Sequence, residues 1–227
     1  MAQIIEWSNS NGGWLALVIF VLGLVVTFLG RLWRKKQSTH SELKIEVIDQ
    51  PTLCSSFDSK NVDENFRLHR TAFLIYLKIT NVGNVPIQID DIHLGYRSEG
   101  ADDPESYRWI TSETTMLEDY KLPMIDNKFK IFPFLKQSNA DIPNSSKTYL
   151  LSGQCEIGLV YFEQEESKGK DYPYMDKDFT VSTKIRVHDT NGHCWETDAA
   201  VVKVKIDAIR EHNPYFGLTR EFIETNT

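Results

Sequence analysis

The sequence is poor in cysteine, with only Cys54, Cys155 and Cys194 among 227 residues. Their number is odd, their spacing is scattered and no CxxC pair occurs. This usage argues against a disulfide framework and against a zinc-finger ligand set. We therefore expect free thiols in a reducing compartment.

Motifs of the common enzyme classes are also missing. The chain contains no phosphate-binding GxxxxGK[ST], no GxSxG nucleophile elbow and no HExxH. The sequence therefore predicts no catalytic residues and no cofactor, and an enzyme is the weakest of the functional hypotheses.

One short segment gathers side chains of the kind that bind metals. His188, Asp189, His193 and Cys194 surround Thr190-Asn191-Gly192, and a hairpin there could place His188 opposite His193, where the two could share a metal or pair with the thiol. Asn-Gly beside Asp and Thr is common hairpin-turn chemistry, which explains much of the segment without a ligand. We predict no metal, with His188, His193 and Cys194 as the candidate ligands.

An excess of positive charge is absent from most of the chain. Residues 1–37 hold four of the 25 basic side chains and one of the 32 acidic ones, which leaves 21 basic and 31 acidic side chains, a net charge near −10. A surface that is this acidic repels a phosphate backbone, and no basic stripe with interleaved aromatic residues offsets the repulsion. The composition argues against nucleic-acid binding.

One long uncharged run is present, WLALVIFVLGLVVTFLG from Trp14 to Gly30, and a segment extended past its end to Trp33 has twenty residues. At about 1.5 Å per residue this length spans a hydrocarbon core of about 30 Å. Trp14 and Trp33 stand at the two ends, where indole rings prefer the membrane interface. The sequence predicts one transmembrane helix over 14–33, with the lipid bilayer as a partner.

The flanks of this run predict its orientation. The thirteen residues before it contain no Lys or Arg, whereas RLWRKK lies at its end, with Arg34, Lys35 and Lys36 as membrane-proximal cations. Because basic residues favour the cytoplasmic side, we expect a single-pass protein in the cell membrane, with its N-terminus outside and its soluble domain in the cytoplasm.

Small residues recur within the apolar run. Ala16, Gly23 and Gly30 follow heptad spacing, and Gly23 with Thr27 forms a small-xxx-small pair. Such positions allow two helices to approach closely, so these four residues are candidate helix–helix contacts in a homo-oligomer. Frequent glycine in membrane helices is the simpler explanation.

Beyond residue 42 the apolar residues recur with a period of two. Alternating or β-branched runs separated by Asn, Gly, Pro and Asp clusters predict seven to nine strands of an antiparallel sandwich, and the polar interval 54–70 reads as a loop. The predicted strands are 43–48, 72–80, 87–96, 107–111, 128–132, 147–151, 155–162, 179–187 and 195–206.

The predicted organisation has five parts. They are a short N-terminus (1–13), the transmembrane helix (14–33), a basic linker (34–42), the β-sandwich (43–206) and a C-terminal tail (207–227). The segment 97–142 is long for a connection within a sandwich, so it is the preferred recognition surface. Pro214, Tyr215, Phe216 and Phe222 favour docking of the tail on the domain over binding to a partner.

Three motifs carry a resemblance to a known class of domain. They are N-V-G-N-V-P-I-Q-I, D-I-P-N-S-S-K-T-Y-L and V-H-D-T-N-G-H-C-W-E, in an order that resembles the immunoglobulin-like β-sandwiches of bacterial surface and membrane-anchored proteins. The resemblance covers residues 43–206 in outline and implies a mainly β, immunoglobulin-like fold. The sequence does not contain a recognisable Cys…Trp…Cys core of the kind found in antibody domains.

Two functional hypotheses follow. The first is a cytosolic binding or scaffolding module that is tethered to the membrane and recognises a protein partner. The alternative is an oligomerising membrane effector, similar in layout to anti-phage proteins, whose β domain senses a ligand or a partner. Oligomeric state separates the two, because one uncharged helix forms no pore alone.

Overall fold

The computed structural model describes residues 12–35, 40–63, 66–101, 103, 106–112, 116, 118–135 and 148–219, without the side chains at 12, 15, 30–35, 60–63, 66 and 127. The chain divides into two compact units, Met1–His40 and Ser41–Thr227.

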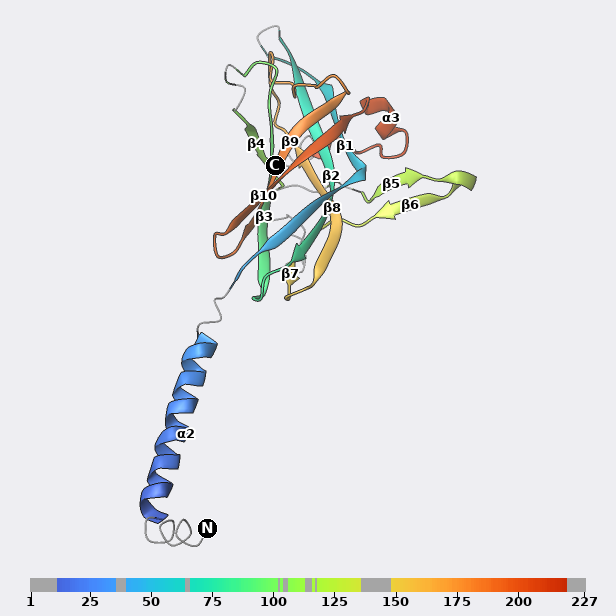
Figure 1. Ribbon diagram of the computed structural model, residues 1–227. Coiled ribbons are helices and arrows are strands. Elements are labelled where there is room, and N and C mark those ends of the chain that lie inside the picture. The colour runs from blue at the N-terminus through green and yellow to red at the C-terminus, as the bar shows by residue number, and fades with distance from the viewer. Residues whose placement is uncertain are drawn as a thin grey trace. The chain divides into compact units, whose positions relative to one another are not determined.

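The first unit contains helix α2 (Gly12–Lys35), drawn in blue in Figure 1. Ala16, Gly23 and Thr27 are exposed, and the Thr27 hydroxyl donates to the carbonyl of Gly23 at 2.7 Å. Among the described residues, no helix has the combination of length and apolar character that a membrane crossing needs. The transmembrane span stays a prediction. The structure describes only the helical backbone at Gly30, Trp33, Arg34 and Lys35. Lys36 lies outside the described residues.

The second unit is mainly β, as predicted. An eight-stranded sheet has the order β4-β3-β9-β10-β1-β2-β8 with β7 paired to β3, and β5 and β6 form a separate hairpin. The strands are β1 (Leu43–Asp63), β2 (Phe66–Asn81), β3 (Ile87–Tyr96), β4 (Arg108–Thr111), β5 (Tyr120–Pro123), β6 (Phe129–Phe132), β7 (Tyr149–Leu150), β8 (Cys155–Glu163), β9 (Thr180–Asp189) and β10 (Cys194–Lys203).

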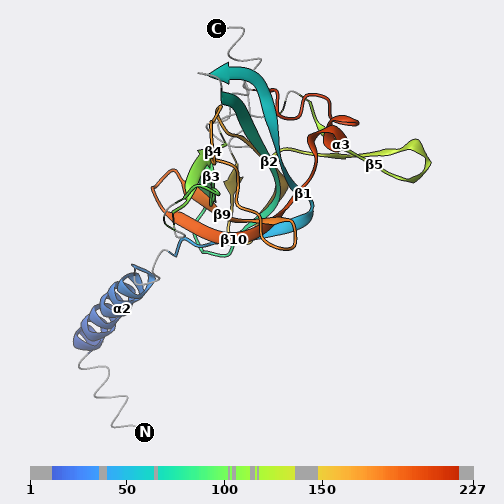
Figure 2. The same ribbon diagram turned by 90° about the horizontal axis from the view of Figure 1, so that it is seen from above.

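The large sheet curves so that its two halves face each other, and Figure 2 shows the strands following one another around the bend. One half contains β3, β9 and β10, and the other contains β1, β2 and β8. Along β9, half-buried and fully buried side chains alternate over all ten residues, so every second residue points inward. Phe73 of β2 and Tyr96 of β3 meet across the interior with ring centroids 5.3 Å apart. The first hydrophobic core lies between the halves, as in a β-sandwich.

A second core covers the opposite face of β2 and β8. There Leu74, Leu159 and Tyr161 pack with residues of the β5–β6 hairpin, of helix α3 (Ile206–Arg210) and of the segment that follows α3. Ile209 and Phe216 of this C-terminal segment are 4% and 0% exposed. The predicted docking of the tail is therefore confirmed for its described part, and Phe222 lies outside that part.

The prediction of a loop over 54–70 is wrong for the described residues of this interval, 54–63 and 66–70. These residues form the second half of β1 and the first part of β2, with Cys54 opposite Phe73 and Phe57 opposite Arg70. The reason is cross-strand pairing within the β1–β2 hairpin. Polar side chains bond across the ladder, as in the 3.0 Å contact between Thr71 Oγ1 and Ser56 Oγ, and no local pattern announces such pairs.

The described strands pair antiparallel, as predicted, with one exception. β1 and β10 pair in parallel through Leu53 with Val202 and Cys54 with Lys203. β1 pairs with β2 on both sides of a register shift between Ile48 and Leu53, and the residues just after the shift also lie beside β10. Pro51 lies within this shift, where its missing N–H costs no ladder bond.

The second core predicts a stability effect at Phe216. Its ring packs edge-on against Tyr161 with centroids 5.7 Å apart. In the Ser41–Thr227 unit, Phe216→Ala should lower the free energy of unfolding by about 3–5 kcal/mol in urea denaturation. The control Tyr215→Ala truncates a ring that is 37% exposed and should cost under about 1 kcal/mol. Equal effects of the two changes would show that the C-terminal segment does not contribute to the core.

Candidate functional site

The β9–β10 turn holds the predicted cluster, but its members pair differently than expected. His188 of β9 lies opposite Cys194 of β10, and Cys194 Sγ is 3.7 Å from His188 Nε2. The prediction that His188 faces His193 is wrong. His193 belongs to the turn, where its Nδ1 lies 2.9 Å from Asp189 Oδ2.

Asp189 explains this arrangement because it organises the turn. Its carboxylate accepts the backbone N–H groups of Asn191 and His193 at 2.9 and 2.8 Å. Burial raises the pKa of Asp189, but the hydrogen bonds from His193 and Asn191 together outweigh burial and hold the pKa below its usual value. Asp189 and His193 therefore act on the turn, while His188 and Cys194 point to the outer face of the sheet.

Strand β3 adds two side chains to the same face. Asp91 is the cross-strand neighbour of His188, and His93 lies two residues further along β3. His93 Nε2 is 2.9 Å from Asp91 Oδ2, and the rings of His93 and His188 have centroids 4.9 Å apart. Asp91 and His93 were not among the predicted candidates, although their i, i+2 spacing within a predicted strand places both on one face.

A cation–aromatic row continues the outer face beside this cluster. The guanidinium of Arg186 lies 3.7 Å from the ring centroid of Trp109, and Arg186 Nε donates to Glu196 at 2.6 Å. Hydrogen bonds from Lys184 and Arg186 lower the pKa of Glu196. Gly95 makes room for the stack, because a Cβ at this position would come within 2.9 Å of the Trp109 indole.

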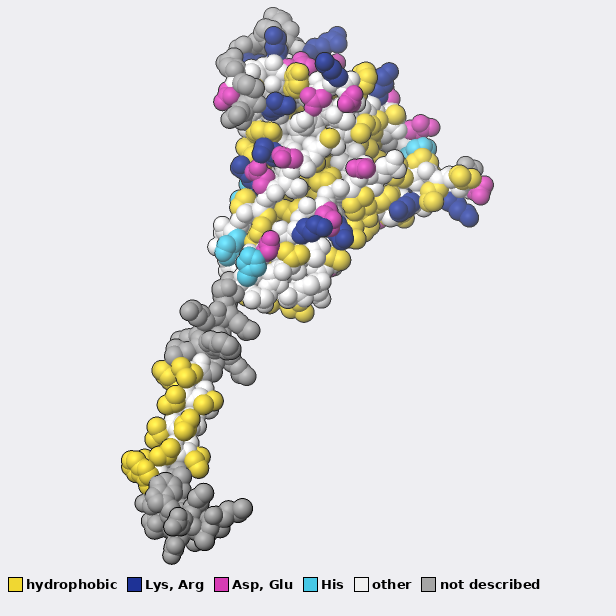
Figure 3. All heavy atoms as spheres, viewed as in Figure 1, with side chains coloured by type: hydrophobic (Ala, Val, Ile, Leu, Met, Phe, Trp, Pro, Cys, Tyr) yellow, Lys and Arg dark blue, Asp and Glu magenta, His cyan; other side chains and the backbone are white. Residues whose placement is uncertain are grey.

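The β5–β6 hairpin lies within the segment 97–142 and projects from the domain (Figures 1 and 2). Its tip contains the 3-10 turn η1 (Ile125–Asn127), where Asp126 adopts a left-handed conformation with φ of 66°. Four apolar side chains of the hairpin are more than half exposed, Ile125 most of all at 87%, with Met124, Phe129 and Ile131. Figure 3 shows hydrophobic and basic side chains side by side on this projection.

The base of the hairpin is held firmly. Tyr120 and Phe132, which face each other across the hairpin, are each 2% exposed in the second core. The side chain of Asn213 binds the backbone of Lys121 at both groups, accepting from its N–H at 2.8 Å and donating to its carbonyl at 2.9 Å. A rigid base thus presents an exposed apolar tip.

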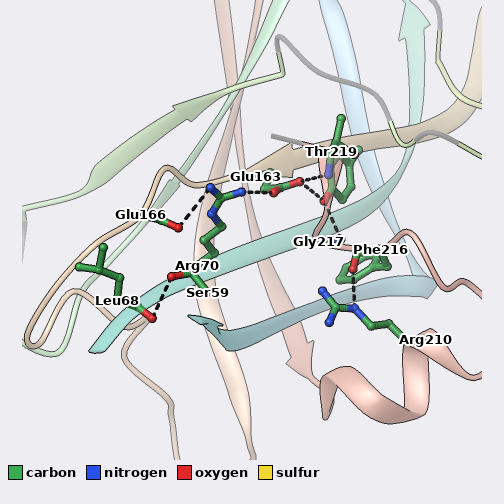
Figure 4. A network of polar contacts seen from close by, with 10 residues as sticks. Ser59, Leu68, Arg70, Glu163, Glu166, Arg210, Phe216, Gly217 and Thr219 are labelled. Carbon is green, nitrogen blue, oxygen red and sulfur yellow. Dashed lines mark hydrogen bonds and ion pairs between the residues drawn. The ribbon is translucent and has the colours of Figure 1, made fainter. Parts of the chain in front are cut away.

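A buried polar network ties the C-terminal segment to β2 and β8 (Figure 4). Arg70 Nη1 lies 3.5 Å from Glu163 Oε1, and Glu163 Oε2 accepts from the Tyr161 hydroxyl at 2.6 Å. The backbone N–H groups of Gly217 and Thr219 donate to Tyr161 Oη and Glu163 Oε2 at 3.0 and 3.2 Å. Burial is the main cause that raises the pKa of Tyr161, and the charge of Glu163 raises it further. These bonds fix the backbone at Gly217 and Thr219 in place, which is a structural role.

Comparisons with known proteins identify no family. No protein-family model matches the chain, and no curated protein matches it at a significant level. Similar solved structures include the ApaA protein from Bordetella pertussis, at 11% identity and a TM-score of 0.28, covering 72% of this chain and 94% of that one.

Two further structures show the same weak level of similarity. Spo0M, a sporulation control protein from Bacillus subtilis, has 11% identity and a TM-score of 0.27, covering 70% of this chain and 51% of that one. The β-D-glucoside glucohydrolase from Trichoderma reesei has 14% identity and a TM-score of 0.25, covering 73% and 19%. Scores this low carry no argument about function.

His69 gives the domain a predicted dependence on pH. The residue is 1% exposed, stacks on Tyr172 with centroids 3.6 Å apart, and its buried Nε2 has no hydrogen-bond partner among the described residues. Burial lowers the pKa of His69. The unfolded chain therefore binds a proton near pH 6.5 that the folded chain takes up only at lower pH.

The stability that neutral His69 contributes is thus complete above about pH 6.5 and is lost as the pH falls through the folded pKa. Urea denaturation of the Ser41–Thr227 unit at several pH values between 7 and 5 should show a falling free energy of unfolding. His69→Phe keeps the stacking but cannot titrate, so its decrease should be smaller. An equal decrease in both proteins would contradict this assignment.

Proposed function

We propose that the protein is a membrane-tethered binding module that captures a protein partner with its β5–β6 hairpin. The observation that carries the proposal is the exposed apolar tip on a rigid base. Exposed apolar side chains that take no part in a core are typical of interaction sites. Ile125 is the most exposed large hydrophobic residue described, at 87%, and it stands at the end of the projection.

Charge indicates the chemistry of the partner. Residues 120–132 carry the three lysines Lys121, Lys128 and Lys130 and one acid, Asp126, whereas the chain beyond residue 37 is strongly acidic. A basic, apolar hairpin on an acidic domain fits an apolar cleft that is bordered by acidic side chains. The complementary charges would favour encounter and orientation, and the apolar tip would supply affinity.

The sequence supports the membrane tether. The uncharged run from Trp14 to Gly30, the bordering tryptophans and the basic residues that follow are the basis for a single-pass helix with the β domain in the cytoplasm. The three quoted motifs support an immunoglobulin-like arrangement of the sandwich. A tether restricts the search for a partner to the membrane surface, which raises the effective concentration of both proteins.

Site-specific photo-crosslinking in cells of the source organism tests the proposal. A benzophenone side chain in place of Ile125 in the full-length protein should give one light-dependent adduct of defined mass. The same group in place of Val202, which is 48% exposed on β10, should give none. In the protein that carries the benzophenone at position 125, Ile131→Asp should abolish the adduct because it places a charge on the apolar surface. Ile157→Asp, at an exposed position of β8, should leave the adduct unchanged.

Three outcomes would contradict the proposal. The first is no adduct at position 125, and the second is the same adduct at positions 125 and 202. The third is an adduct of twice the chain mass, because the partner would then be a second copy and the effector hypothesis would gain support.

A further inference from the structure

Four side chains of metal-binding type from three neighbouring strands lie on the outer face of the domain, three of them in one compact group and the fourth, Cys194, beside His188. Asp91 and His93 come from β3, His188 from β9 and Cys194 from β10. Asp91, His188 and Cys194 lie directly opposite one another across the two strand pairs. Figure 3 shows histidine side chains gathered near the end of the domain where β3 and β10 lie in Figure 1.

The distances suit a small ion. One ligand atom each from Asp91, His93 and His188 lies within 4.8 Å of the other two, and all three residues are half-buried. Cys194 Sγ is 3.7 Å from His188 Nε2. In a tetrahedral zinc site, bonds of about 2.3 Å to sulfur and about 2.0 Å to nitrogen place these two donors about 3.5 Å apart. The thiol and imidazole therefore already have nearly the required spacing.

The backbone holds these donors in position. A register shift between Ile89 and Asp91 inserts one extra residue into β3, so Ile89 and Ile92 both stay in the core while Asp91 turns outward. Bulges of this kind re-aim side chains next to functional sites. On the other side, the bonds of Asp189 within the β9–β10 turn fix the register that sets His188 opposite Cys194.

The geometry points to a binding site for a zinc-type divalent transition metal, with Asp91 Oδ, the imidazole nitrogens of His93 and His188 and the Cys194 thiolate as ligands. Mixed oxygen, nitrogen and sulfur donors suit Zn²⁺ and Co²⁺ better than the all-oxygen ions Mg²⁺ and Ca²⁺. Arg186, the nearest cation of β9, is paired to Glu196 at 2.6 Å, which balances its charge.

Four protein ligands would close the coordination shell, and closed shells are typical of structural metal sites. The ion would link β3, β9 and β10 at the end of the domain that carries the β9–β10 turn. The site is independent of the β5–β6 hairpin, so it stands whether or not the hairpin binds a partner.

Cobalt absorption spectroscopy tests the site directly. The full-length protein in detergent, first treated with a chelator and a phosphine reductant, is titrated with Co²⁺ and then with Zn²⁺. One Co²⁺ per chain should bind, with the near-ultraviolet charge-transfer band of a thiolate ligand and the intense visible bands of tetrahedral cobalt, and Zn²⁺ should displace it. Zn²⁺ should also raise the melting temperature, because it binds the folded state.

Variants assign the ligands one by one. Cys194→Ser should remove the charge-transfer band, and His188→Ala and His93→Ala should each weaken binding at least tenfold. Cys155→Ser alters an exposed thiol elsewhere, and His193→Ala removes the neighbouring imidazole but keeps the backbone N–H bond to Asp189, so neither should change the spectrum or the affinity. Melting curves without metal show that each variant is folded.

The proposal is overturned by the absence of a thiolate band at saturation in the folded wild-type protein. It is also overturned if Cys155→Ser removes the band, or if His193→Ala weakens binding as much as His188→Ala does.

Discussion

The burial of both faces of β2 and β8 is the constraint on which the rest of the domain depends. In β2 the residues from Ala72 to Ile75 are fully buried, and in β8 the residues from Gly158 to Glu163 are buried without alternation. A strand in this position needs cover on each side. The β3, β9 and β10 half of the sheet covers one face, and the hairpin, α3 and the C-terminal segment cover the other.

This layering determines which surfaces are free for function. The outer face of β3, β9 and β10 carries the Asp91, His93, His188 and Cys194 cluster and the Trp109 and Arg186 stack. The hairpin base belongs to the third layer through Tyr120 and Phe132, while its tip extends beyond that layer. The two candidate sites thus lie on opposite sides of the buried middle layer, and each is rooted in a core.

The sequence predicted the class of the domain but only part of its pairing. Alternation in residues such as 180–189 is a local signal, so the strands and the mainly β class could be read directly. The β1–β2 ladder runs through a polar interval that lacks alternation, and the parallel β1–β10 pair depends on partners distant in the chain. For the same reason only half of the metal-binding cluster was predicted. His188 and Cys194 are near each other in sequence, whereas Asp91 and His93 join them only through the register of β3 with β9. The exposed tip of the β5–β6 hairpin could not be predicted. Packing of residues 206–219 against the base of the hairpin decides which hairpin side chains are covered and which stay exposed.

Hydrogen exchange of the Ser41–Thr227 unit, followed by mass spectrometry, tests the three-layer account most directly. The account predicts slow exchange in β2 and β8, comparable protection in the segment 213–219 that Tyr161, Glu163 and Phe216 hold in place, and fast exchange in the hairpin tip 125–127. If 213–219 exchanged as fast as the tip while β2 and β8 stayed protected, the third layer would not exist in solution. The rigid base of the hairpin would then be lost with it.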